Sequence, residues 1–212
     1  MIISFGIPEH DRDRVADLYW QAFEQKLGLV MGPSDKGRSF VRRVLMSDHA
    51  LCAHTDDGAL LGVAGFKTHA GALVSGTFAD LRQIYGLFGA SWRGFLLNML
   101  ERDTENRRFL MDGIFVAPEA RGRGVGTALL GAITDTARDR GYEEVRLDVI
   151  DSNDRARALY EREGFTAIKT ARLGPLRHIF GFRSATTMVR AVHQPDPINA
   201  PAPKTNAPPS TT

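Results

Sequence analysis

The chain has 212 residues, of which 43% are hydrophobic and 25% are charged. A globular chain of this length can bury one substantial core, so we expect a single domain. The formal net charge of +2 comes from nearly balanced acidic and basic residues and gives no electrostatic case for nucleic-acid or membrane binding. A single cysteine, no signal-peptide pattern and no apolar stretch of membrane-spanning length predict a soluble cytoplasmic protein.

The first 50 residues predict one strand and two helices. The apolar run Ile2–Ile7 is typical of an edge strand. Apolar side chains then recur at helical spacing from Asp11, in the position of an N-cap, to about Leu27, and Gly28, Gly32 and Pro33 are expected to break the helix. A second amphipathic helix is expected to begin at Ser34 or Asp35.

The next 50 residues predict a hairpin followed by helical structure. Two strand-like runs, 51–55 and 60–67, flank Asp56-Asp57-Gly58, which is a strong turn signal. Residues 77–100 carry aromatic and aliphatic side chains at helical spacing, interrupted by glycines. This pattern indicates two helices or one broken helix.

The remaining chain alternates strands with helices and then loses its apolar residues. It predicts strands at 109–116, 144–149, 165–170 and 187–192, a helix ended by Gly141, and a helix opened by Asp151-Ser152-Asn153. Residues 194–212 are rich in proline and poor in apolar side chains, so we expect a disordered tail after one domain spanning 1–193. The order of elements favours an α/β fold with a mixed sheet.

A glycine-rich loop lies between the strand 109–116 and the following helix, in the run Arg121-Gly122-Arg123-Gly124-Val125-Gly126-Thr127. Glycines allow a tight turn in which successive backbone N–H groups converge. The first N–H groups of a helix have no intrahelical partner and carry a partial positive charge, which suits a phosphate. The sequence therefore predicts an anion site, although an ordinary tight turn between a strand and a helix is the alternative.

Two other phosphate-binding motifs fit this loop poorly. A P-loop requires Gly-Lys-Ser/Thr, whereas Gly126 is followed directly by Thr127. A dinucleotide fingerprint requires an acidic residue after the next strand, which Asp148 or Asp151 could supply, but no further βαβ units follow. The P-loop is therefore excluded and the dinucleotide fingerprint is disfavoured.

The run Arg121-Gly122-Arg123-Gly124-Val125-Gly126 resembles the Arg/Gln-x-x-Gly-x-Gly/Ala motif of the GNAT superfamily, the acetyl-CoA-dependent N-acetyltransferases. Asn153, Leu159-Tyr160 and Gly164-Phe165 follow in the order and at about the spacing of that superfamily. The resemblance extends from about Phe109 to Phe165. It implies a mixed, mostly antiparallel central sheet that is flanked by helices and whose fourth and fifth strands splay apart.

The resemblance also implies acetyl-CoA as co-substrate and no metal. The backbone of the loop would hold the pyrophosphate of coenzyme A, through Arg121, Gly122, Arg123, Gly124, Val125, Gly126 and Thr127. The strand residues Ile114, Phe115 and Val116 would offer backbone hydrogen bonds to the pantetheine arm. Asn153 would contact the coenzyme, cap its helix, or do both.

Two residues are candidates for proton transfer. Tyr160 matches the tyrosine that many members use as general acid, and a tyrosine remains protonated at neutral pH; its alternative role is helix packing. Asp112 lies on the preceding strand and is expected to act as general base or to bind the amine. Some members carry their glutamate base where this chain has Leu110, and this chain departs from them there. The alternative role of Asp112 is a structural pair with an arginine.

The acceptor is expected to be a primary amine of a small molecule, with a peptide amine or a non-catalytic coenzyme A-binding module as alternatives. In this superfamily the acceptor is contacted by segments outside the coenzyme motif, here 28–47, 76–100 and 173–183. The aromatic segment 76–100 could form a wall of an apolar pocket. It could equally pack on the sheet or form the surface of a homodimer. His54, His69 and His178 lack metal-ligand spacing.

Overall fold

The computed structural model describes residues 1–98 and 107–192. Its strands are β1 (Ile2–Phe5), β2 (Ala50–His54), β3 (Leu60–Thr68), β4 (Gly71–Ala72), β5 (Arg108–Val116), β6 (Glu144–Ile150), β7 (Thr166–Arg172) and β8 (Ser184–Ala191). Its helices are α1 (Arg12–Met31), α2 (Ser34–Val44), α3 (Phe78–Asn98), α4 (Val125–Asp139), α5 (Asp154–Arg162) and the short α6 (Arg177–Phe180). The tail expected at 194–212 lies outside the described residues.

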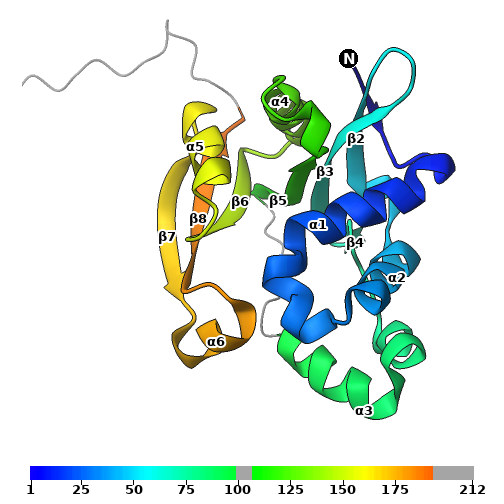
Figure 1. Cartoon of the computed structure of the whole chain (residues 1–212). Helices are drawn as coiled ribbons and strands as arrows, with labels where there is room; N and C mark the ends of the chain where they lie inside the picture. Colours follow the sequence, from blue (N-terminus) through cyan, green and yellow to red (C-terminus); the bar gives the residue numbers. More distant parts are fainter. Residues whose placement is uncertain (99–106, 193–212) are drawn as a thin grey trace, which may run out of the picture.

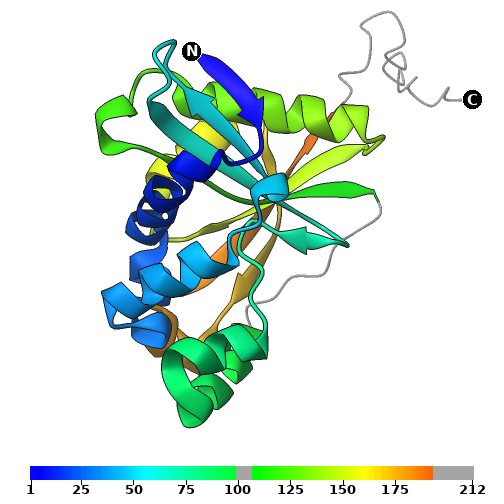
Figure 2. The same ribbon diagram turned by 90° about the vertical axis from the view of Figure 1, so that its right-hand side faces the viewer.

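One eight-stranded sheet organises the molecule, with strand order β1-β2-β3-β5-β6-β8-β7 and β4 paired to β3 (Figures 1 and 2). Every neighbouring pair is antiparallel except β5 and β6, which are parallel. The expected hairpin is confirmed as β2 and β3, and the expected edge strand as β1. The mixed, mostly antiparallel sheet is therefore confirmed.

The two parallel strands separate soon after they meet. Their pairing consists of Arg108 with Glu144, Phe109 with Val145 and Leu110 with Arg146. β5 then continues to Val116 and β6 to Ile150 without pairing to each other. The splay expected between these strands is thus confirmed, and it begins immediately after Leu110.

A β-bulge lies at the point where the splay begins. Gly65 of β3 pairs with Gly113, but the next residue, Phe66, pairs with Met111. Asp112 is consequently the extra residue on β5, without a partner on β3. Bulges bend a strand and redirect a side chain, so simple alternation does not determine where Asp112 points.

Helices cover both faces of the sheet beside this bulge. A Cβ added at Gly62 of β3 would meet Val125 and Leu129 of α4. A Cβ added at Gly113 of β5 would meet the ring of Phe23 from α1, at 2.7 Å. Gly62 pairs with Val116, which is three positions from Gly113 along β5, and side chains alternate along a strand. α4 and α1 therefore pack on opposite faces.

The first helix differs from the sequence-based expectation at both ends. It passes through Gly28 and ends at Met31, before Gly32 and Pro33, because packing along the apolar stripe outweighs the cost of one glycine. Asp11 occupies the N-cap position, but its side chain makes no capping hydrogen bond. Its carboxylate instead lies 2.7 Å from His54 Nε2, so it ties the start of α1 to β2.

α3 is the broken helix that the sequence predicted, with the break at Gly86, where φ is 70° and ψ is 176°. Its first turn is held by a capping box formed by Thr77 and Asp80. The Thr77 hydroxyl donates a hydrogen bond to the Asp80 carboxylate, and the Asp80 backbone N–H donates one to Thr77 Oγ1. Both halves contact the end of α1: the Tyr85 hydroxyl, just before the break, donates to the carbonyl of Met31, and Arg93, after it, donates to that of Gly32 at 3.1 Å. The helix is thereby fixed next to α1 and α2 (Figure 1).

Candidate active site

The glycine-rich loop has the geometry of an anion site. Gly122 and Gly124 have φ of 76° and 79°, a region that favours glycine, and α4 begins at the next residue, Val125. The N–H groups of Val125, Gly126 and Thr127 precede the first intrahelical hydrogen bond, which Ala128 donates to Gly124. A Cβ added at Gly122 or Gly124 would meet nothing within 4 Å. The loop is thus an open cradle that fits a pyrophosphate.

The start of α4 is held in place by α5. The Thr127 hydroxyl donates to Glu163 at 2.7 Å, and a Cβ added at Gly126 would touch Leu159 at 3.0 Å. Arg121 and Arg123 are both exposed beside the loop. The sequence-predicted glycines and arginines are therefore assembled at one place, and Gly126 allows the close approach of α5.

β5 offers free backbone positions along the splay. The Ala117 N–H donates to Leu61 of β3 at 2.9 Å, so the peptide groups of Ala117, and of Phe115 two residues earlier, face β3. The peptide groups of Ile114 and Val116, which alternate with these, therefore face the splay. There the Val116 carbonyl accepts a 3.3 Å hydrogen bond from Arg121 Nε. Ile114 and Val116 are thus positioned to pair with an extended ligand, whereas the Phe115 side chain is buried against Tyr19 and Phe23.

α5 carries the next two candidates. The Asn153 side chain accepts a hydrogen bond from the Ala156 N–H at 3.1 Å, which confirms its role as N-cap. Tyr160 is buried and packs against Phe165, with ring centroids 5.9 Å apart. Burial raises the pKa of the Tyr160 hydroxyl above its ordinary value. The hydroxyl therefore stays protonated throughout the neutral range.

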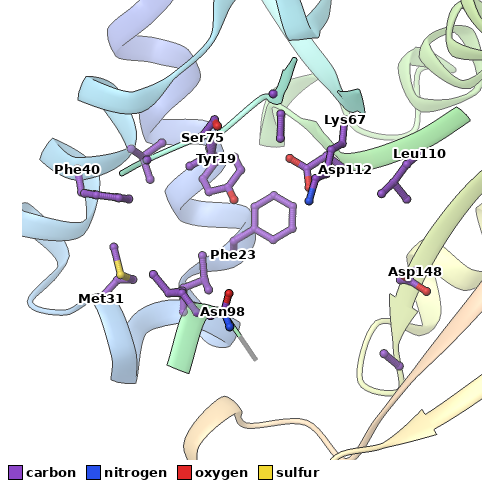
Figure 3. A pocket seen from close by; sticks show the side chains of 18 of the residues that line it. Tyr19, Phe23, Met31, Phe40, Lys67, Ser75, Asn98, Leu110, Asp112 and Asp148 are labelled. Carbon is purple, nitrogen blue, oxygen red and sulfur yellow. The ribbon is translucent and has the colours of Figure 1, made fainter. Parts of the chain in front are cut away.

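A cavity of about 1090 Å³ adjoins the splay on the side of α1 (Figure 3). Its walls come from α1, α2 and α3, from β3 with β4, and from β5, β6 and the end of β7. Phe78, Leu81, Phe95 and Leu97 of α3 line it. The described part of the aromatic segment, residues 76–98, therefore forms a wall of a pocket, which is one of the roles expected for the segment 76–100.

Two carboxylates line this cavity, one from each splayed strand. Asp112 is exposed at the bulge of β5, and Asp148 lies on β6. Asp148 accepts a hydrogen bond from the Thr187 hydroxyl, and its Oδ2 lies 3.8 Å from Arg146 Nη2. Figure 3 shows Asp148 across the opening from Asp112, beside which Lys67 lies. The structure thus brings Asp112 to the acceptor side of the splay.

Tyr19 is a site residue that the sequence did not single out. Its side chain lines the cavity and stacks near Phe23, with ring centroids 4.5 Å apart. Burial and the negative charge of Asp112 raise the pKa of the Tyr19 hydroxyl. In the sequence Tyr19 is one member of an apolar helical stripe, and only its hydroxyl distinguished it. Lys67 and Asp148 were missed as cavity residues because only the strand order brings them near Asp112.

Other polar candidates lie elsewhere. Glu119 is on the surface and forms an ion pair of 2.7 Å with Arg14. Cys52 is buried in β2, and burial together with the charge of Asp11 raises its pKa to about 12, so it is a poor nucleophile. Within residues 1–98 and 107–192, no three His, Cys, Asp or Glu side chains are grouped so as to hold a metal ion. In the same ranges, no helix combines the length and apolarity that crossing a bilayer requires.

Comparison with known proteins agrees with this geometry. The family model described as the acetyltransferase (GNAT) family matches residues 12–165. A mycothiol acetyltransferase from Beutenbergia cavernae is 51% identical over 53 residues, which are 25% of this chain and 18% of that protein. A thialysine N-epsilon-acetyltransferase from Bos taurus is 34% identical over 83 residues, 38% of this chain and 42% of that protein. These matches therefore span less than half of either relative.

The fold is shared with solved structures over nearly the whole chain. The crystal structure of an N-acetyltransferase from Staphylococcus aureus Mu50 superposes with a TM-score of 0.63 at 15% identity, covering 90% of this chain and all of that one (100%). The family model spans the glycine loop, both splayed strands and α5. The chain therefore belongs to the acetyltransferase (GNAT) family, whose acyl donor is acetyl-CoA.

Proposed function

We propose that this protein transfers the acetyl group of acetyl-CoA to a primary amine of a small molecule. The observation that carries the proposal is the position of the cavity, which adjoins the splay and is lined by Asp112 of β5 and Asp148 of β6. A donor lying along β5 from the glycine loop would end there. The two relatives are named for small molecules, mycothiol and thialysine, which supports an acceptor of that size.

The donor site consists of the loop and the free edge of β5. The N–H groups of Val125, Gly126 and Thr127 would bind the pyrophosphate, with Arg121 and Arg123 as adjacent cations. The backbone of Ile114 and Val116 would pair with the pantetheine arm as an added strand. Bound acetyl-CoA supplies a thioester that a neutral amine attacks directly, forming an amide and releasing a thiolate.

Two side chains would handle the protons of this transfer. Asp112 would hold the acceptor's ammonium group and accept a proton from it, leaving the nitrogen lone pair free to attack. Tyr160 would donate its proton to the departing thiolate, and its burial supports this role because the hydroxyl remains protonated. The nitrogen would lose a second proton as the amide forms, and this proton would return through solvent to Tyr160, while Asp112 would release its own proton to solvent.

An assay of thiol release tests the proposal. The protein is incubated with acetyl-CoA and a panel of primary amines, and free coenzyme A is measured with a thiol reagent. We expect release that depends on the amine, together with an acetylated product of matching mass. Acetyl-CoA binding without release would instead favour a non-catalytic coenzyme A-binding module. Faster release with peptides than with every small amine would favour a peptide N-acetyltransferase.

A further inference from the structure

The walls of the cavity divide sharply by chemistry. The described lining residues from α1, α2 and α3 include no charged side chain, and apart from Gly94, Asn98 and the Tyr19 hydroxyl they are aromatic or aliphatic. They are Tyr19, Trp20, Phe23, Leu27, Met31, Phe40, Val41, Phe78, Leu81, Gly94, Phe95, Leu97 and Asn98. The helical side of the cavity is therefore an apolar wall.

The charged lining residues all come from the strands and the turns that adjoin them. Lys67, Asp112 and Asp148 lie around the opening of the splay (Figure 3), and Arg172 ends β7. Figure 3 also shows Tyr19 and Phe23 between this charged side and Met31 and Phe40 on the far wall. A ligand that fills the cavity thus meets the charged side chains on the strand side and mainly apolar side chains on the helical side.

The apolar wall continues onto the surface of the molecule. Phe78 and Phe95 line the cavity and are also 49% and 68% exposed. Apolar side chains exposed together on a soluble protein commonly mark a binding site. These two residues belong to both the cavity and the surface. They therefore connect the exposed side of α3, the side that carries Phe78 and Phe95, to the proposed acceptor site.

We propose that the acceptor is an amphiphilic primary amine, with its amino group at Asp112 and Asp148 and an extended apolar body along α1, α2 and α3. This inference rests on the proposed function and specifies its substrate class. A polyamine or an aminoglycoside would bring further charged or hydroxyl groups against the helical wall, where they would lose water without gaining partners. The cavity volume of about 1090 Å³ leaves room for a body much larger than the amino group itself.

The test is a series of unbranched primary alkylamines from butylamine to decylamine, assayed by thiol release with saturating acetyl-CoA. We expect kcat/KM to rise about fourfold for each added methylene, as the burial of one CH₂ predicts, until the wall is covered. Diamines of equal length are the matched controls, because they replace the terminal methyl with an ammonium group. We expect each diamine to react at least about tenfold more slowly than the alkylamine of its length.

Two variants of α3 locate the apolar body. Phe95→Ser removes a ring that lines the cavity, whereas Phe88→Ser removes a ring of the same helix that is 89% exposed and does not line it. We expect Phe95→Ser to lower kcat/KM for decylamine about tenfold and for butylamine less than twofold, and Phe88→Ser to change neither. The mass of each variant in solution is measured by light scattering.

The outcomes separate this inference from the function it depends on. Thiol release that is independent of chain length, or faster with diamines or peptides, overturns the amphiphilic acceptor and leaves acetyl transfer standing. The absence of release with every amine overturns both. Equal loss of activity in Phe95→Ser and Phe88→Ser, accompanied by dissociation of an oligomer, would assign α3's exposed side to a second copy of the chain and overturn its assignment to the acceptor.

Discussion

Asp112 and Asp148 each lie two residues beyond Leu110 and Arg146, the last pair that joins β5 to β6. The two carboxylates therefore face the same cavity from the two strands at the point where those strands separate. Asp148 is held by Thr187 and lies near Arg146, so its position and charge are fixed by its own strand and by β8. Asp112 is placed at the same opening by the bulge of β5.

Replacing Asp112 should impair use of the acceptor more than binding of the donor. We expect Asp112→Asn to lower kcat/KM for the amine by about 10²-fold, because a positioned base contributes about 10²- to 10⁴-fold and the amide cannot accept the proton. Acetyl-CoA affinity, measured by calorimetry, should stay within twofold. Asp135→Asn, a matched change at an exposed residue of α4, should leave both quantities unchanged. A normal rate in Asp112→Asn would exclude it as base and as amine-binding group.

Replacing Tyr160 should affect turnover alone. Tyr160→Phe keeps the ring that packs against Phe165 but removes the hydroxyl, so we expect turnover to fall at least about tenfold with acetyl-CoA affinity nearly intact. Tyr142→Phe, a matched change at a ring that packs against Phe109, should leave turnover unchanged. Unaltered turnover in Tyr160→Phe would remove Tyr160 from the mechanism.

The pH dependence offers an independent check on Tyr160. Because burial raises the pKa of this hydroxyl, the acid form persists above the ordinary tyrosine pKa of about 10. We therefore expect no decline of kcat between pH 8 and pH 10 in the unmodified protein, measured with the acceptor saturating. A decline with an apparent pKa in that interval that is absent from Tyr160→Phe would contradict the raised pKa.

The sequence predicted what depends on local pattern. The loop around Gly122 and Gly124, the strand before it and the Asn153 cap are all encoded within a few residues, and the structure has them as expected. The side chains around Asp112 were only partly foreseen. Lys67 and Asp148 are far apart in the chain and line the same cavity only because β3 and β6 both border β5. The bulge at Asp112 likewise follows from the register of two strands, which periodicity alone does not give.

The ends of α1 show the same limit on a smaller scale. Gly28 breaks a helix in an isolated segment, but here buried side chains on either side of it, among them Val30 and Trp20, keep the helix intact to Met31. Asp11 has the right identity and position for a cap, yet its carboxylate contacts His54, which lies 43 residues away. In both cases a tertiary contact outweighed the local signal.

The glycine loop should respond differently to alanine at two positions. Gly124 has φ of 79°, where a Cβ is strained, so we expect Gly124→Ala to destabilise the fold by about 1–2 kcal/mol and to weaken acetyl-CoA binding. Gly131 lies within α4, where a Cβ would meet nothing within 4 Å. Gly131→Ala should stabilise the protein by about 0.5–1 kcal/mol and leave binding unchanged. Urea denaturation measures the change in stability, and calorimetry measures acetyl-CoA binding. Equal behaviour of the two variants would contradict the requirement for glycine at position 124.

The capping box of α3 should make part of the stability depend on pH. Hydrogen bonds from the side chain and backbone of Thr77 and from Arg43 lower the pKa of Asp80 to about 2. A lowered folded-state pKa means that the carboxylate stabilises the fold above its unfolded pKa of about 3.9, and that this contribution is lost as the pH falls towards 2. Asp80→Ala should therefore lower the free energy of unfolding by about 1–2 kcal/mol at pH 7.

Urea denaturation of Asp80→Ala and the unmodified protein at pH 7, 5, 4 and 3 measures this contribution. The difference between the two proteins should be constant from pH 7 to pH 5 and should shrink below pH 4, because the Asp80 carboxylate is then protonated in the unfolded state while it is still ionised in the folded state. Thr77→Ser keeps the hydroxyl that donates to Asp80 and should behave like the unmodified protein at every pH. A difference that stays constant down to pH 3 would show that Asp80 acts through packing, and the capping box would then not be what holds the first turn of α3.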